Sequence, residues 1–398
     1  MKNMLSVLTG RSFRASRMRN LIATLAIVLT TVLFTAVTTI GMGAAESITL
    51  TMQMLKGSRS DGDFHNMTAE QYEALKDADF IREYGLRMPV GFLANTTRHN
   101  IEFDVLDSVQ ADLTFCMPVH GSAPKAENEI VTSDAALRDL GVEPETGVAV
   151  TIVFTAHGRE YELDMIVSGW FEATSEQISM MWTGTAFRDA HPDIFEYTYD
   201  QDRDMAGTYY SDFIATSTAG LQENMDHWVW QMGGDPDAVN SCNLSATINT
   251  VTNPVLEPTT LLLGAVIIVL FVLCGYLLIY NVFDIAVMQE IRRYGLYRTV
   301  GMSRRQIKKL INLQALWLSS VGIPLGLLIG YFVGKATLPY MMHTLSSSYE
   351  NVAINVKPSP IVFVGAAVLA AFTVFLSTRK PIRVAANIPA FEAFRYVE

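Results

Sequence analysis

Three aspartates at alternating positions, Asp200, Asp202 and Asp204, are the residues whose spacing first suggests chemistry. Carboxylates in this order open one kind of calcium-binding loop. The glycine that such a loop needs after its third ligand is missing, and Ser211 stands where a bidentate glutamate should close it. We therefore expect a solvated acidic loop here rather than a metal site.

Common catalytic motifs are absent from the sequence. The 7 histidines are scattered, and none lies in the H-E-x-x-H pattern of a zinc hydrolase. No G-x-S-x-G turn and no G-x-x-x-x-G-K-[ST] phosphate loop occurs. We therefore expect a chain that is not an enzyme, with no catalytic residue, no metal and no cofactor of its own. Any ATP that it uses must be bound by a partner subunit.

The 3 cysteines leave the redox state open. Cys116 and Cys242 lie in the long polar segment and could form a disulfide in an oxidising compartment, whereas Cys274 lies in an apolar run. Nothing in their spacing requires a bridge, so free thiols are the favoured interpretation.

Four stretches without Asp, Glu, Lys or Arg, at residues 21–45, 260–279, 313–333 and 361–376, determine the class of protein. A helix of about 20 apolar residues crosses a hydrocarbon core of ~30 Å. We predict transmembrane helices over residues 21–45, 260–279, 313–333 and 361–377. The first is too long for a signal-peptide core and is expected to be retained rather than cleaved. The short fourth stretch has a buried or interfacial helix as its alternative.

The charges sort into two populations that the predicted spans separate. Residues 1–20, 280–312 and 377–398 carry 16 Lys and Arg against 4 acids, whereas residues 46–259 carry 11 against 35. Short basic loops stay on the cytoplasmic side. We therefore predict a multi-pass protein of the plasma membrane with cytoplasmic residues 1–20, 280–312 and 378–398. Residues 46–259 and 334–360 are expected outside, and the net charge of -11 describes the outer domain rather than a nucleic-acid partner.

The predicted outer domain, residues 46–259, mixes two structural periods. Thr68 and Gln71 have the spacing of a capping box, and Ser133 precedes an apolar helix pattern that Gly141 should end. A β-branched run at 148–154, a turn at 156–159 and an alternating run to residue 167 predict a hairpin. The fold class is thus four transmembrane α-helices with one large mixed α/β extracytoplasmic domain inserted between helices 1 and 2.

The loop between the second and third spans combines basic residues with glycine breaks. We expect the helix of the second span to continue inward, to be interrupted at Gly295 and Gly301, and to restart at a capping box of Ser303 and Gln306. The basic residues displayed are Arg292, Arg293, Arg298, Arg304, Arg305, Lys308 and Lys309. Either the loop touches anionic lipid headgroups, or it is a rigid elbow that docks into a partner protein.

Residues 287–307 resemble the segment that follows the second span in FtsX-like permeases, the MacB-type family of ABC transporters. The positions that match the family pattern are Glu290, Ile291, Gly295, Leu296, Arg298, Gly301 and Ser303. The resemblance implies that this elbow, together with Arg293, Arg304 and Arg305, meets a cytoplasmic ATPase. Residues 387–395 are similar to the closing motif of the family, and residues 129–171 resemble, more weakly, its periplasmic core domain.

Four glycines in the third span, Gly322, Gly326, Gly330 and Gly334, repeat every four residues and form one smooth helix face. Such a face allows two membrane helices to pack closely. The alternative is the ordinary enrichment of glycine in membrane helices, which four regular repeats disfavour.

The resemblance implies a permease subunit of an ABC transporter. It would couple ATP hydrolysis by a separate ATPase to movement of the outer domain, for export, lipid or peptide handling, or mechanotransmission. A second permease subunit, identical or homologous, and the lipid bilayer are its expected partners. No Asp, Glu, His, Lys or Arg lies within the predicted spans, which argues against a proton relay. The alternative is a membrane-anchored sensor of peptide or antibiotic without transport. The sequence leaves open the substrate, the direction of action and whether this is a complete permease or one repeat of a longer one.

Overall fold

The structure is a computed structural model that describes residues 17–98, 100–173, 179–196, 206–237, 243–252, 258–345 and 359–387. The chain forms two compact units, a helical unit of residues 1–48 and 256–398 and a sheet unit of residues 49–255. The acidic triplet at 200–204, Cys242 and all but the first residue of the 387–395 motif lie outside the described residues.

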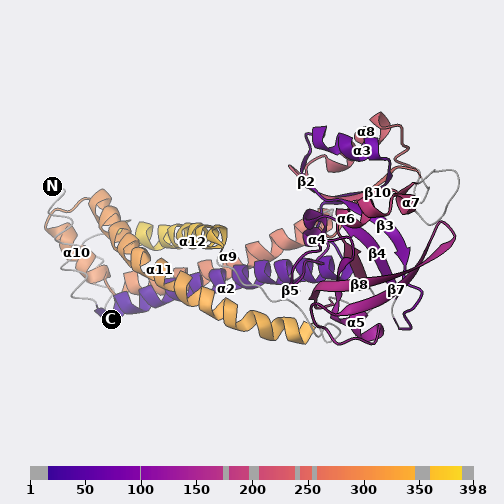
Figure 1. Cartoon of the computed structure of the whole chain (residues 1–398). Coiled ribbons are helices and arrows are strands. Elements are labelled where there is room, and N and C mark those ends of the chain that lie inside the picture. The colour runs from indigo at the N-terminus through magenta and orange to yellow at the C-terminus, as the bar shows by residue number, and fades with distance from the viewer. Residues whose placement is uncertain are drawn as a thin grey trace. The chain divides into compact units, whose positions relative to one another are not determined.

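The helical unit is built from long helices (Figure 1). They are α2 (Arg17–Lys56, whose last eight residues belong to the sheet unit), α9 (Pro258–Met288), α10 (Ile291–Thr299), α11 (Arg304–Leu345) and α12 (Pro360–Asn387). Four ranges, Arg17–Lys56, Leu261–Met288, Arg304–Met342 and Pro360–Asn387, are long and apolar enough to cross a membrane. The chain is therefore a membrane protein with a large additional domain, while the exact span boundaries stay predictions.

The break before α10 lies earlier than the sequence predicted. Helix α9 ends at Met288 and α10 begins at Ile291, so the chain turns at Gln289 and Glu290. The predicted interruption at Gly295 is wrong, because Gly295 is buried inside α10. One glycine costs a helix only about 1 kcal/mol, which the burial of neighbouring apolar side chains outweighs. The predicted break at Gly301 is correct, with φ of +97°.

The sheet unit contains eleven strands among the described residues. They are β1 (Gly62–Met67), β2 (Ile81–Tyr84), β3 (Arg87–Phe92), β4 (Ile101–Leu106), β5 (His120–Gly121), β6 (Glu129–Ser133), β7 (Ala149–Ala156), β8 (Arg159–Phe171), β9 (Ser179–Thr183), β10 (Tyr209–Ala215) and β11 (Ser245–Ile248). Its short helices are α3 (Ala69–Ala74), the 3₁₀ turn η1 (Leu75–Asp77), α4 (Ser108–Leu113), α5 (Asp134–Asp139), α6 (Thr185–Ala190), α7 (Pro192–Phe195) and α8 (Leu221–Gln231).

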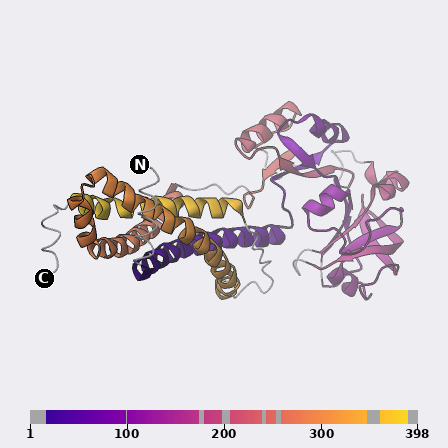
Figure 2. The ribbon, with the colours of Figure 1, turned by 90° about the vertical axis from the view of Figure 1, so that its left-hand side faces the viewer.

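The strands form one mixed sheet in the order β11-β1-β10-β3-β4-β9-β6-β8-β5, with β2 paired to β10 and β7 to β8. The pairs β4–β9 and β6–β8 are parallel, and the other pairs are antiparallel. Helices α3 and α8 lie side by side in both Figure 1 and Figure 2 and cover the part of the sheet formed by β1, β10 and β11. The expected mixed α/β character is present.

Three apolar clusters lie in the described part of the sheet unit, and two of them are larger than the third. One gathers around Phe103, which contacts the rings of Phe154 and Phe187, and it joins β4, β7 and α6. The other gathers around Phe64, which lies 4.7 Å from the Trp228 ring and joins β1 to α8. The third cluster, around Trp182, joins α4, β6, β8 and β9, so burial of apolar surface stabilises the unit at three places.

Local signals in this unit were correctly predicted. The Thr68 hydroxyl accepts a hydrogen bond from the Gln71 backbone N–H, and the Gln71 side chain accepts one from the Thr68 N–H. Ser133 caps α5 by accepting from the Ala136 N–H, and Gly141 follows its end with φ of +79°. The predicted hairpin is β7–β8. These motifs succeed because they satisfy backbone groups within a few residues.

The buried carboxylate of Asp104 forms an ion pair, whereas those of Asp61 and Asp212 accept hydrogen bonds. Arg87 contacts the carboxylates of Asp104, at 2.6 Å, and of Glu102, at 2.7 Å. Burial raises the pKa of Asp104 to about 7, although the Arg87 guanidinium acts in the opposite direction. Cys116 is buried and free, and burial raises its pKa to about 12, which makes the thiol unreactive.

Candidate functional site

A buried ion cluster fixes the start of α10. Glu290, 4% exposed, lies between α9 and α10, and its carboxylate forms ion pairs with Arg19 of α2 and with Arg293, the latter at 3.1 Å. The neighbouring Tyr294 is 2% exposed. Burial raises the pKa of Tyr294 well above its usual range, and the Glu290 carboxylate adds to the effect, so the phenol stays protonated.

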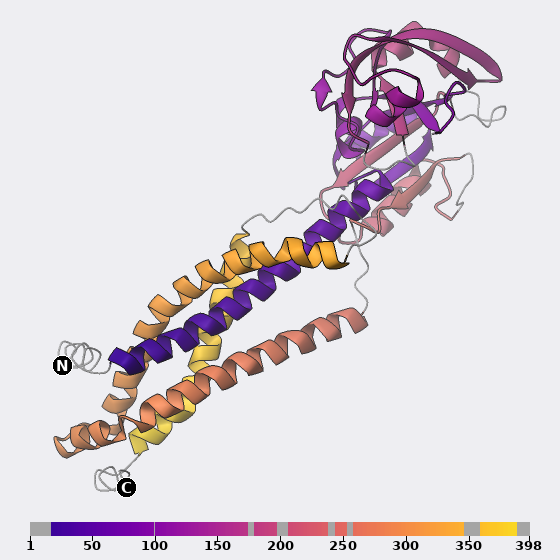
Figure 3. The same cartoon turned by 90° about the horizontal axis from the view of Figure 1, so that it is seen from below.

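The inner face of α10 is apolar. Tyr294 packs in one cluster with Val287 at the end of α9 and with residues at one end of α11 and of α12. Those residues are Ile307, Leu310, Ile311, Ile382, Ala385 and Ala386. Helix α10 therefore lies at one end of the helical unit and is held by three other helices (Figures 1 and 3). A helix of nine residues would be marginal alone, and this packing is what stabilises it.

The far end of α10 is closed by backbone geometry. The Gly301 N–H donates to the Arg298 carbonyl, and the Met302 N–H donates to the Tyr297 carbonyl, both at 3.0 Å. This pair of bonds is a Schellman motif, which needs a residue with positive φ at Gly301. Ser303 and Gln306 then form the predicted capping box at the start of α11. The turn between α10 and α11 has little conformational freedom, because hydrogen bonds satisfy the backbone groups at the end of α10 and at the start of α11.

The outer face of the elbow consists of Leu296, Arg298, Val300, Arg304 and Arg305. Leu296 is 46% exposed and Val300 86% exposed. Arg304 and Arg305 are exposed, whereas Arg298 is half-buried. The exposed apolar pair thus lies at the end of α10, close in the chain to the arginines that open α11, while the opposite side of α10 is packed. Ile291 belongs to the buried side.

The four glycines of α11 lie against α2 (Figure 3). A methyl carbon added at Gly326 would stand 2.5 Å from Thr31 Cβ, and one added at Gly330 would stand 2.7 Å from Thr35 Cβ. The same close approach occurs between Gly334 and Thr39, at 2.8 Å, and between Gly322 and Ile27, at 2.9 Å. The contacts repeat every four residues on both helices, so no side chain larger than hydrogen fits at these positions without displacement.

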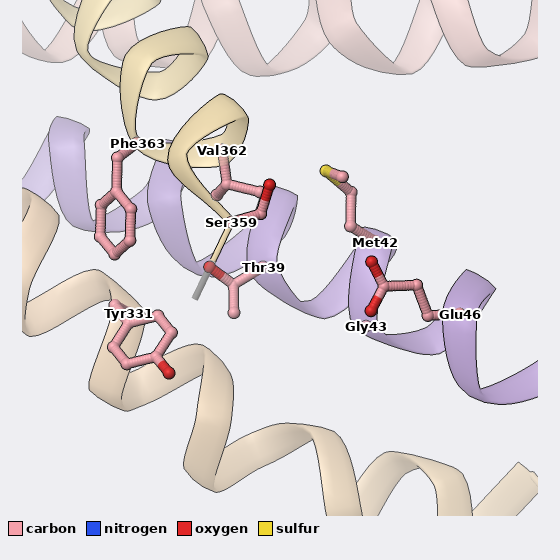
Figure 4. Close-up of a pocket in the computed structure, with 8 residues that line it drawn as sticks. All are labelled: Thr39, Met42, Gly43, Glu46, Tyr331, Ser359, Val362 and Phe363. Carbon is pink, nitrogen blue, oxygen red and sulfur yellow. The ribbon is translucent and has the colours of Figure 1, made fainter. Parts of the chain in front are cut away.

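A small cavity lies about 20 residues farther along α2 from Arg19 (Figure 4). Thr39, Glu46, Tyr331 and Phe363 are among its lining residues, and its volume is about 10 Å³. That is roughly the room one water molecule needs. The cavity has no space for a transported molecule.

Arg19 is the site residue that sequence reasoning missed. It was counted only as one of the basic residues that keep the N-terminus inside, because nothing in its neighbourhood reveals a partner more than 250 residues away. The sequence offers one signal for this ion pair: a cation stands at the start of one apolar segment, and an acid stands just after the end of another. Among the described residues, no group of three or more His, Cys, Asp or Glu could hold a metal ion.

Residues 265–389 match the family described as FtsX-like permease C-terminal. An uncharacterized ABC transporter permease protein of Mycobacterium tuberculosis is 29% identical over 126 residues, which are 31% of this chain. The chain spans 14% of the length of that relative.

Two solved structures resemble part of the chain. One is the extracellular domain of the noncanonic ABC-type transporter YknZ from Gram-positive bacteria, with 13% identity and a TM-score of 0.30 over 46% of this chain and 89% of that one. The other is a domain described as part of a permease protein from Porphyromonas gingivalis, with 11% identity and a TM-score of 0.30 over 50% and 94%.

Removing the charge of Glu290 should loosen α10. In Glu290→Gln the Arg19 guanidinium stays buried without its carboxylate, which costs about 3–5 kcal/mol. We expect α10 amides to exchange with deuterium more than tenfold faster in detergent micelles. The double variant Arg19→Met/Glu290→Met should recover most of the protection, because two apolar groups replace the pair. Unchanged exchange in Glu290→Gln would contradict the structural role of the cluster.

Filling one glycine of α11 should destabilise the helical unit. Gly326→Ala forces Thr31 aside, and overpacking of this kind costs about 1–3 kcal/mol. The matched control is Gly365→Ala on α12, where nothing lies within 4 Å of the added carbon. The midpoint of thermal unfolding in detergent should fall for Gly326→Ala and stay or rise for Gly365→Ala. Equal midpoints would rule out close packing at Gly326.

Proposed function

We propose that this chain, whose residues 265–389 are an FtsX-like permease C-terminal domain, is the membrane subunit of an ABC transporter. The resemblance predicted from residues 287–307 is confirmed by that match. In our proposal the chain couples ATP hydrolysis in a separate ATPase subunit to movement of the sheet unit.

The proposed topology follows the charge distribution. Helices α2, α9, α11 and α12 cross the plasma membrane, with both termini and α10 on the cytoplasmic side. The sheet unit, with its excess of acids, lies outside the cell. The span boundaries are those predicted above, residues 21–45, 260–279, 313–333 and 361–377.

The observation that carries the proposal is that one side of the elbow is packed and the other side is exposed. Its inner side is fixed by the Glu290 cluster and by apolar packing, and its outer face exposes Leu296 and Val300 beside arginines. Exposed apolar side chains next to arginine are typical of protein interfaces. Because such a helix moves as one body with its neighbours, a partner that pushes the outer face shifts α2, α9, α11 and α12 together.

The route from the elbow to the sheet unit is continuous in the chain. Arg19 ties α10 to the start of α2, and α2 runs unbroken from Arg17 to Lys56, into the first residues of the sheet unit. The glycine contacts couple α2 to α11 along four turns. A displacement at α10 is thereby transmitted through helices rather than through loops.

The partners of this assembly are an ABC ATPase subunit and a second permease subunit. The glycine face of α11 already contacts α2 within the chain, so we assign the second subunit to a different surface. Export, lipid or peptide handling and mechanotransmission are all compatible with this mechanism. The sensor alternative has no observation of its own in its favour.

Charge reversal on the outer face should release the ATPase. We expect Arg298→Glu/Arg304→Glu, expressed together with its partner ABC ATPase, to lose at least tenfold in co-purified ATPase. In the variant, two glutamates would repel the acidic partner surface that the arginines attract. Like charges brought together at an interface reduce the binding free energy by roughly several kcal/mol. Arg383→Glu, an exposed cation on α12 outside the elbow, is the matched control and should retain the partner. Full retention by the double variant would contradict docking at this face.

A further inference from the structure

A groove between α11 and α12 begins beside the elbow, with which it shares Arg305, and has none of the four α11 glycines in its lining. Its volume is about 570 Å³, and it begins at Arg305, Lys308 and Lys309 and runs along α11 to Ser319. Helices α11 and α12 form its two sides, and they pack on each other over much of their length (Figure 3).

The two ends of the groove differ in chemistry. One end carries three cations of α11, and no carboxylate is among the lining residues. Arg379 of α12 adds a fourth cation nearby, with its guanidinium carbon 4.2 Å from the ring centre of Phe375, which lines the groove. This end therefore attracts an anion.

The rest of the groove is apolar. Ala315 and Val374 are buried and form its floor, and Leu316 and Phe375, 69% and 55% exposed, form its walls. The hydroxyl of Ser319 donates to the Ala315 carbonyl, and that of Thr378 donates to the Val374 carbonyl, both at 2.8 Å. These two hydroxyls are satisfied within their own helices, and the third uncharged polar lining residue, Asn312, is an exposed residue one turn from Lys308 and Lys309. The part of the groove beyond Asn312 therefore demands no polar ligand.

The length of the groove fits one leaflet. From Lys308 to Ser319 the helix rises roughly 16 Å at ~1.5 Å per residue, which is about half of a ~30 Å hydrocarbon core. With the topology of the proposed function, on which this step rests, the cations lie at the level of the cytoplasmic headgroups.

We propose that this groove binds one anionic phospholipid of the cytoplasmic leaflet, with the phosphate at Lys308 and Lys309 and an acyl chain along Leu316 and Phe375. Charge complementarity selects an anionic headgroup, and the apolar lane selects a lipid over a soluble phosphate. A bound lipid fills the space between α11 and α12 and stiffens the helices that carry the elbow.

Native mass spectrometry of the full chain, titrated with phosphatidylglycerol or phosphatidylcholine, tests the proposal. The wild type should retain phosphatidylglycerol well above phosphatidylcholine. Lys308→Gln/Lys309→Gln should weaken that retention by roughly tenfold or more, the size expected for two headgroup-level lysines. The matched control Lys335→Gln/Arg383→Gln removes two exposed cations outside the groove and should retain the lipid.

A second variant tests the apolar lane. Ala371→Phe fills the groove without changing its charge, so it should also reduce retention of phosphatidylglycerol. Equal retention of both lipids, retention by the lysine variant, or full competition by glycerol 3-phosphate would overturn the proposal. A dimer that binds no lipid would assign the groove to a second copy of the chain. Co-purification of the ATPase is a separate readout, so failure here is distinguishable from failure of the proposed function.

Discussion

The buried pair of Arg19 and Glu290 is the interaction on which the helical unit depends. Two groups from opposite parts of the chain are both removed from water, which is favourable only because each neutralises the other. The pair links the start of α10 to α2. Apolar packing and the Schellman motif at Gly301 hold the rest of α10, but neither of them supplies this link to α2.

The glycine face has a related consequence. Four glycines on α11 meet Ile27, Thr31, Thr35 and Thr39 on α2, and the threonine hydroxyls of 31 and 35 donate to carbonyls of their own helix. At Gly326 and Gly330 the contact is therefore one of shape, because the threonine hydroxyls that face these glycines bond within α2. Two helices packed this closely have few alternative arrangements, because a small shift of one along the other brings their backbones into collision. The fixed attachment of α10 and the close packing of α2 on α11 together favour rigid-body motion of these helices.

Signals confined to a few residues were readable in the sequence, whereas partners far apart in the chain were not. Thr68, Ser133 and Ser303 cap helices as expected, because a cap needs only the next three residues. The glycine face was visible as a repeat, but its partner on α2 was not, since a repeat describes one surface only. Glycine propensity alone predicts a break at Gly295, whereas the packing of the neighbouring Tyr294 keeps this residue in the helix. Arg19 was read as a topology signal, and its pairing with Glu290 became apparent only in three dimensions.

The central claim is that a stiff elbow transmits force from a separate ATPase to the sheet unit. The most direct measurement is the distance between two spin labels, one at Arg383→Cys, an exposed position of α12 outside the elbow, and one at Glu162→Cys, an exposed position of β8. It is made in a chain without native cysteines and in complex with its ATPase. The account predicts that ATP shifts the distance distribution, and that the shift disappears when residues 289–303 are replaced by a Gly-Ser linker of equal length. The same ATP-dependent shift with the linker in place would contradict it.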